Sequence, residues 1–113
     1  MVNNQMTDLS QVFGALSDPT RRAILERLTL GEFTVSDLAA PFSSSMPAIS
    51  KHLNVLESAG LIERQTIGRQ RLCTLAPLAL NEAAAWIQNH TRFWNEQLDS
   101  LGDYLQSEKE TQL

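Results

Sequence analysis

Residues 43–60 read SSSMPAISKHLNVLESAG, and this stretch decides the fold. Three serines form a polar turn, and the last of them, Ser45, can cap a helix that begins at Met46. Pro47 falls in the first turn of that helix, where its missing N–H loses no hydrogen bond. Apolar residues then recur at helical spacing until a glycine ends the pattern: Ile49, Leu53, Leu56 and Gly60. We predict a helix over residues 46–59 with one apolar face.

A shorter helix precedes this one in the sequence. Thr34-Val35-Ser36-Asp37 has the spacing of a capping box, with Asp in place of the usual Glu. Pro41 helps to end the short helix that follows. A short helix, a polar turn and a longer helix form a helix-turn-helix, here over about residues 34–60. Two earlier helices are predicted over residues 9–16 and from Pro19 to about Leu30.

The sequence period changes after the long helix. Residues 62–67 and 70–75 alternate apolar or β-branched residues with polar ones, and Gly68-Arg69 lies between them. This pattern predicts a two-stranded hairpin, or wing, over about residues 61–75. Cys73 lies in the second strand, and we interpret it as a packed, inert thiol. The predicted fold is mainly α with a small β-hairpin, a winged helix-turn-helix.

A long last helix is predicted over about residues 80–106, with residues 107–113 as a frayed tail. Apolar residues recur along it at alternating steps of four and three, and a second apolar row adjoins them. A helix on the surface of a monomer needs only one such stripe. We therefore predict that one stripe packs on its own domain, residues 1–106, and that the other packs on a second copy. The alternative is a small core that wraps this helix.

Length and composition exclude several classes of protein. The chain has 113 residues, 42% hydrophobic and 19% charged, which suits one small folded domain. It has a single cysteine, no apolar run long enough for a membrane span, and no signal core at its N-terminus. We expect a reduced, cytoplasmic protein with no membrane partner. No catalytic motif or phosphate loop is present, so neither an enzyme nor a cofactor is expected.

The net charge of −4 conceals a basic middle segment. Residues 44–75 carry two acidic side chains and four basic ones, which are Lys51, Arg64, Arg69 and Arg71. Acidic segments flank it on both sides. This pattern favours a local site for nucleic acid on a body that otherwise repels it. The alternative is a solvated helix face and a strand edge that charge keeps soluble.

Several motifs together resemble one known family. They are FGALSDPTRRAIL at 13–25, SMPAISKHL at 45–53, VLESAGLI at 55–62, GRQR at 68–71, and RFW with LDSL at 92–101. The chain is similar over about residues 8–106 to the arsenic-repressor-like, or ArsR, winged helix-turn-helix regulators. The resemblance implies a homodimeric transcriptional regulator, usually a repressor and often of its own operon, that binds a palindromic operator in double-stranded DNA.

The resemblance also implies which residues form the sites. The recognition helix and wing would contact DNA through Ser45, Met46, Pro47, Ala48, Ser50, Lys51, His52, Arg64, Arg69, Gln70 and Arg71. Met46 stands where a polar residue is common, and it could meet a thymine methyl but read no hydrogen-bond pattern. The first and last helices would form the dimer through Leu9, Val12, Phe13, Leu16, Trp94, Leu98, Leu101 and Leu105.

The metal-sensing sites known in this family lack their ligands here. One such site uses cysteines in the third helix, where this chain has Val35-Ser36-Asp37-Leu38. Another uses paired Asp, His and Glu along the last helix, where His90 is the single histidine. We expect a regulator that does not respond to metal. Two alternatives stay open: a protein-interaction module without DNA binding, and a repressor gated by an unidentified small molecule between the last helices.

Overall fold

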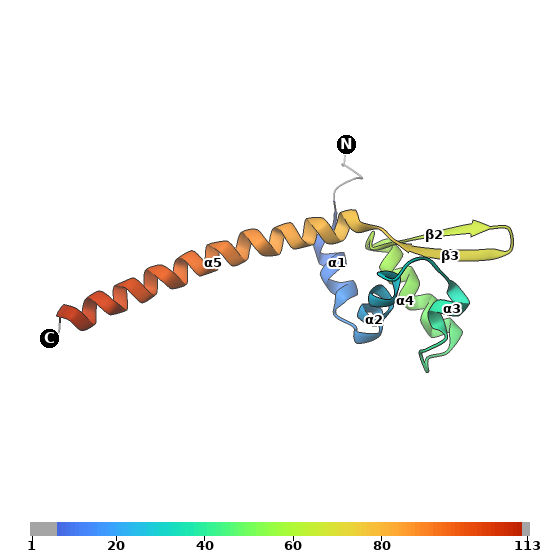
Figure 1. The fold of residues 1–113 in the computed structure, drawn as a ribbon, viewed down its shortest axis with the longest axis horizontal. Coiled ribbons are helices and arrows are strands. Elements are labelled where there is room, and N and C mark those ends of the chain that lie inside the picture. The colour runs from blue at the N-terminus through green and yellow to red at the C-terminus, as the bar shows by residue number, and fades with distance from the viewer. Residues whose placement is uncertain (1–6, 112–113) are drawn as a thin grey trace. The chain divides into compact units, whose positions relative to one another are not determined.

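The computed structural model describes residues 7–111. In chain order the elements are α1 (Leu9–Leu16), α2 (Pro19–Leu28), β1 (Phe33–Thr34), α3 (Val35–Ala39), α4 (Met46–Ser58), β2 (Ile62–Ile67), β3 (Gln70–Leu75) and α5 (Pro77–Thr111) (Figure 1). A mainly helical chain with a small β-hairpin was predicted, and this is confirmed. Helix α2 ends two residues earlier than the predicted Leu30.

The first four helices begin in the same way. In each, a side-chain oxygen accepts a hydrogen bond from the backbone N–H three residues on, which satisfies a donor that has no partner within the helix. The pairs are Asp8 with Gln11, Asp18 with Arg21, Thr34 with Asp37, and Ser45 with Ala48, at 3.0–3.3 Å. The predicted cap at Ser45 is therefore confirmed, and α4 begins at Met46 as the sequence indicated.

Helix α4 ends in a tight reversal that leads directly into the wing. Gly60 has φ of +78°, a left-handed conformation that glycine adopts without steric cost. The N–H of Leu61 donates to Leu56 O at 3.0 Å, and the N–H of Gly60 donates to Glu57 O at 2.9 Å. These two bonds form a Schellman motif. As a result, only three residues separate the end of α4 from the start of β2.

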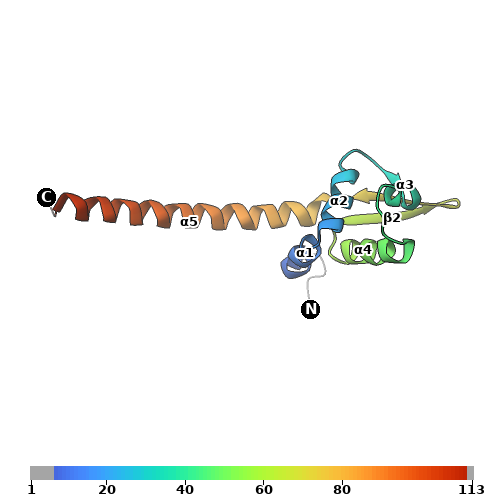
Figure 2. The same cartoon turned by 90° about the horizontal axis from the view of Figure 1, so that it is seen from below.

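The wing is larger than the sequence indicated. Strands β2 and β3 pair antiparallel, and the partners Ile67 and Gln70 leave Gly68-Arg69 as the predicted turn. The short strand β1 also joins β3, so the sheet has three strands in the order β1-β3-β2. Two residues are too few to show a strand period, which is why the sequence did not reveal β1. Figure 2 shows α3 and α4 on either side of the hairpin.

One apolar core joins α1 to α4, the sheet and the first turns of α5. Its members include Val12, Ile24, Leu38, Ile49, Leu53, Leu56, Leu61, Ile62, Cys73, Ala79 and Ala83. Residues 84–108 form a separate unit in which every side chain is exposed. Helix α5 begins at Pro77 and continues to Thr111. The helix therefore extends beyond the predicted limits of about 80 and 106 and includes residues 107–111 of the predicted tail, whose last two residues lie outside the described part of the chain.

We expect Gly60→Ala to lower the free energy of unfolding by about 1–2 kcal/mol, because a Cβ is strained at its left-handed φ. Space is not limiting, since the added Cβ would lie 3.5 Å from the Cβ of Ala79. Gly14→Ala in α1 is the matched control. It lies in a helix with nothing within 4 Å of an added Cβ, and we expect it to raise stability by about 0.5–1 kcal/mol. Urea unfolding of both variants tests this, and equal effects would contradict it.

Candidate nucleic-acid interface

The orientation of α4 is set by its buried side. Ile49, Leu53 and Leu56 are all 0% exposed, so they hold one face of the helix against the core. The opposite face is therefore in solvent. Lys51 is exposed and Ser50 is half-buried. The predicted residues Ser45, Met46, Pro47 and Ala48 form the cap and first turn of this helix.

The wing tip carries the second group of predicted residues. Gly68 has φ of +62°, which suits the tight turn between β2 and β3. Arg69, Gln70 and Arg71 follow it and are all exposed. Arg69 in the turn and Arg71 at the start of β3 present two exposed guanidinium groups. Such groups are suited to contact phosphate oxygens, which they can bind with two parallel hydrogen bonds.

A groove of about 530 Å³ brings the two groups together. It lies between the start of α3, the start of α4 and the wing tip. Its lining includes five of the predicted DNA-contact residues: Met46, Ser50, Arg69, Gln70 and Arg71. The groove also contains Asp37, which the sequence did not suggest and whose carboxylate is unfavourable for phosphate. A polar helix face and a basic turn, far apart in sequence, thus line one groove.

His52 turns toward the start of α2. Its Nδ1 lies 3.3 Å from Nη1 of Arg21 and 4.0 Å from Oδ2 of Asp18. A guanidinium can only donate, so the first contact is a hydrogen bond only when Nδ1 carries no proton. A hydrogen bond from the backbone N–H of Arg21 holds the pKa of Asp18 below its usual range, and His52 adds to this. Nδ1 of His52 thus faces Arg21 and Asp18.

Arg21 itself is a structural residue. Its Nε donates to Ala15 O at 2.7 Å and its Nη2 donates to Gly14 O at 3.1 Å, so it caps the end of α1. Arg22 makes a similar bond to Leu16 O at 2.6 Å. The sequence could not show this, because an arginine near a helix start is equally compatible with a solvated face.

Arg64 makes different contacts from the arginines of the wing tip. It lies near the base of β2, and its Nη2 donates to Asn54 Oδ1 and to Glu57 Oε1, each at 2.7 Å. The hydrogen bond from Arg64 holds the pKa of the Glu57 carboxyl below its usual range. The sequence prediction grouped Arg64 with Arg69 and Arg71, but in the structure its charge is already paired with α4.

The predicted dimer residues fall into three groups. Leu9, Phe13 and Leu16 in α1 are half-buried. Val12 is 0% exposed within the single chain, so it has no surface to offer and the prediction for it was wrong. The residues predicted in α5 are 52–62% exposed: Trp94, Leu98, Leu101 and Leu105.

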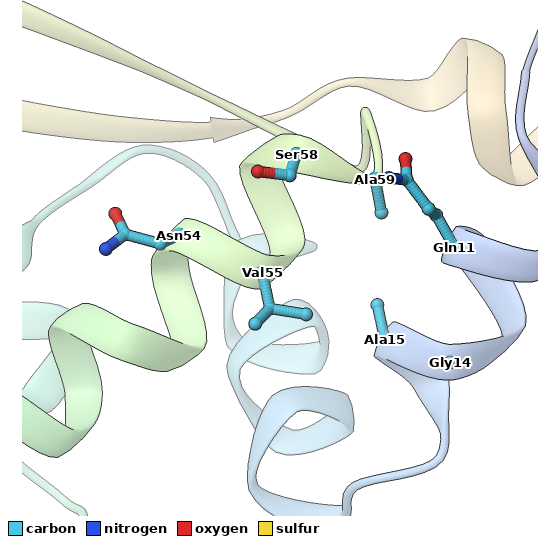
Figure 3. Close-up of a pocket in the computed structure, with 7 residues that line it drawn as sticks. All are labelled: Gln11, Gly14, Ala15, Asn54, Val55, Ser58 and Ala59. Carbon is cyan, nitrogen blue, oxygen red and sulfur yellow. The ribbon is translucent and has the colours of Figure 1, made fainter.

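Among the described residues, no group of three or more His, Cys, Asp or Glu side chains could hold a metal ion. Within the same part of the chain, no helix is long and apolar enough to cross a membrane. Cys73 is buried, as predicted, and its burial raises the pKa of its thiol. A hollow of about 380 Å³ between α1 and α4 is lined by small, apolar or uncharged residues, including Gln11, Ala15 and Val55 (Figure 3).

Known proteins share both the sequence and the fold. A helix-turn-helix domain family matches residues 16–65. The transcriptional repressor SdpR of Bacillus subtilis is 40% identical over 81 residues, which cover 72% of this chain and 90% of that protein. An ArsR-like transcriptional regulator from a Rhodococcus species is 35% identical with a TM-score of 0.72, and the match covers 82% of this chain and 88% of that one.

A third similar protein is known from a solution structure. It is a homodimeric winged helix-turn-helix DNA-binding domain from Mycobacterium bovis, a possible ArsR-family regulator. It is 26% identical with a TM-score of 0.58, and the match covers 80% of this chain and 81% of that one. The predicted resemblance is confirmed: the chain belongs to the ArsR family of winged helix-turn-helix transcriptional regulators.

Proposed function

We propose that this protein is a homodimeric, sequence-specific repressor that binds a palindromic operator and controls its own or a neighbouring operon without responding to metal. The observation that carries the proposal is the groove that joins the start of α4 to the basic wing tip. Phosphate contacts position a protein on DNA and base-edge contacts select the sequence. This surface offers groups for both.

In the proposed complex α4 enters the major groove and the wing reaches the flanking backbone or minor groove. The hydroxyl of Ser50 both donates and accepts hydrogen bonds, so it suits base edges. Met46 is 47% exposed and offers an apolar contact for a thymine methyl. Lys51, Arg69 and Arg71 supply positive charge for phosphates.

The overall charge supports selective rather than general DNA binding. The net charge is −4, so the body of the protein repels a phosphate backbone. Affinity for random DNA depends almost entirely on phosphate contacts. A few cations on an acidic body should therefore bind random DNA weakly, and base contacts must supply the affinity for the operator.

The exposed apolar side chains of α5 support self-association. Trp94, Leu98, Leu101 and Leu105 are spaced by steps of four, three and four, as in the seam of a coiled coil, and all are more than half exposed. Further large apolar side chains adjoin this seam: Trp86, Ile87, Phe93 and Tyr104. Exposed apolar surface of this extent marks an interface. A second copy, as in the homodimeric Mycobacterium bovis relative, would also match the two-fold symmetry of a palindromic operator.

The Bacillus subtilis relative is named a repressor, which favours repression over activation. The described residues offer no metal-binding cluster, and the single thiol is buried, which favours regulation without metal. We assign the protein to the cytoplasm, where its proposed DNA target lies.

DNA binding can be tested on an operator selected by the wild-type protein from a random duplex library. We expect Arg69→Ala and Arg71→Ala each to flatten the plot of log affinity against log salt by about one unit, because each removes a phosphate contact. Ser50→Ala should weaken operator binding by roughly 1–3 kcal/mol and leave random DNA unaffected. Arg92→Ala removes the same charge from α5 and is the control. If Arg71→Ala and Lys51→Ala bind the operator as the wild type does, α4 and the wing tip are not the DNA-binding surface. If the wild type selects no operator at all, the protein-interaction alternative is favoured.

The dimer can be tested by sedimentation. We expect a wild-type mass of twice 12.6 kDa at micromolar concentration. Leu98→Glu with Leu101→Glu should give monomers, because charged side chains would be buried in the apolar seam. Asn95→Glu with Gln106→Glu adds the same two charges on the polar side of α5 and should stay dimeric. A wild-type mass of 12.6 kDa would overturn the proposed dimer.

Zinc, cadmium and arsenite should leave operator affinity unchanged. Soft and borderline metals need several thiolate or imidazole ligands at one place, and no such cluster lies among the described residues. A fluorescence anisotropy titration of the operator complex with each ion provides the measurement. Release of DNA at a stoichiometric concentration of any of the three would refute regulation without metal.

A further inference from the structure

Arg64 lies where the wing leaves the recognition helix. Helix α4 ends at Ser58 and β2 begins at Ile62, so the connection is short and its backbone is closed by the Schellman bonds. Arg64, the third residue of β2, then donates two hydrogen bonds back to α4, to Asn54 and Glu57. Figure 3 shows the amide of Asn54 turned away from the hollow between α1 and α4.

The contact has the geometry of a strong, directional attachment. Both distances are 2.7 Å, at the short end for a charged N–H donor. The two acceptors lie on successive turns of α4, so one guanidinium nitrogen is held from two directions. The Arg64 side chain is only 21% exposed, whereas that of Glu57 is 43% exposed. The Arg64 side chain is thus largely buried, whereas its partner Glu57 is a surface residue.

The other side of the wing is fixed by the core. Arg64 pairs in register with Cys73 of β3, whose side chain is 0% exposed. The base of the hairpin is thus held by the core through β3 and by α4 through Arg64. Beyond Arg64 the strands continue to the turn, and all six residues from Gln65 to Gln70 are exposed.

Because the hairpin is held only at its base, a small change of angle there produces a larger displacement of its tip. Gly68 lies four residues beyond Arg64, a distance of about 13 Å along an extended strand. A change of about 10° in the angle at the base would move the tip by about 2 Å over that length. Such a displacement exceeds the tolerance of a hydrogen bond to phosphate.

We propose that Arg64 is a positioning residue that sets the angle of the wing against the recognition helix, so that Arg69 and Arg71 reach phosphates while α4 reads the major groove. This inference rests on the proposed DNA-binding function. It replaces the sequence-based interpretation of Arg64 as a direct DNA contact. Glu57 and Asn54 are the partners through which it acts.

The proposal predicts that removal of Glu57 lowers the affinity for DNA, which is opposite to the effect expected from its charge. By electrostatics alone, removal of a carboxylate from an acidic protein strengthens DNA binding. If Glu57 holds Arg64 in place, its removal instead weakens operator binding, although no cation is lost. Glu63 provides the matched comparison, because it is an exposed glutamate one residue from Arg64 in β2.

The experiment measures the affinity of the full-length protein for the selected operator and for random duplex DNA across a salt series. Wild type is compared with Glu57→Ala, Glu63→Ala and Glu57→Gln, at temperatures well below the unfolding transition of each variant. The same Glu57→Ala change is also made in a protein that carries Arg69→Ala and Arg71→Ala. Hydroxyl-radical footprinting reports protection of the DNA that flanks each half-site.

We expect Glu57→Ala to weaken operator binding by roughly tenfold, about 1.4 kcal/mol. The slope of log operator affinity against log salt concentration should also become shallower by about one to two units, because Arg69 and Arg71 no longer reach phosphates. Flanking protection should be lost. Glu57→Gln retains an acceptor and should have a smaller effect. Glu63→Ala should bind both DNAs as tightly as the wild type or slightly more tightly.

In the protein without Arg69 and Arg71, Glu57→Ala should cause no further loss, because the wing tip has no cations left to position. The inference is overturned if Glu57→Ala behaves as Glu63→Ala does, or if its full effect persists without Arg69 and Arg71. A wild-type protein that binds no DNA overturns the proposed function itself. If the wild type binds the operator and Glu57→Ala binds it equally well, only the proposed role of Arg64 is overturned.

Discussion

The burial of one face of α4 is the constraint on which the rest of the structure depends. Ile49, Leu53 and Leu56 are fully buried against a core that also contains Ile24 and Leu38. Because a helix is a rigid cylinder, three buried positions on one side set the direction of every other side chain on it. The polar residues of α4 are therefore presented to solvent by packing, and they need no further device to hold them there.

The arginines illustrate how one residue type takes several roles in a small protein. Arg21 closes the end of α1, Arg27 lies 4.7 Å from the ring centroid of Phe33, and Arg64 links the wing to α4. Arg69 and Arg71 at the wing tip are exposed and line the groove. A guanidinium presents five donors in a planar group, so it can join backbone carbonyls, carboxylates and rings with equal ease. A charge count alone does not distinguish these roles.

An acidic protein that binds DNA depends on where its charges lie rather than on their sum. Arg69 and Arg71 lie beside the start of α4 because the groove joins α4 to the wing tip, while the acidic residues of α5 beyond Ala84 belong to a separate unit. The same separation explains the apolar surface of α5. Between residues 84 and 108 no residue of this helix is buried, so the large side chains there are exposed in the single chain.

Local sequence determined most of the elements of this protein. The caps at Thr34 and Ser45, the glycines at the end of α4 and in the turn of the wing, and the two sequence periods predicted the helices and the hairpin, because each acts within a few residues. What only the tertiary structure decided involves residues distant in sequence. Strand β1 exists because β3 pairs with it, Val12 is enclosed by the core, and Arg64 near the base of β2 is paired with Glu57 of α4. No local pattern encodes such contacts, because they arise only when separate elements pack together.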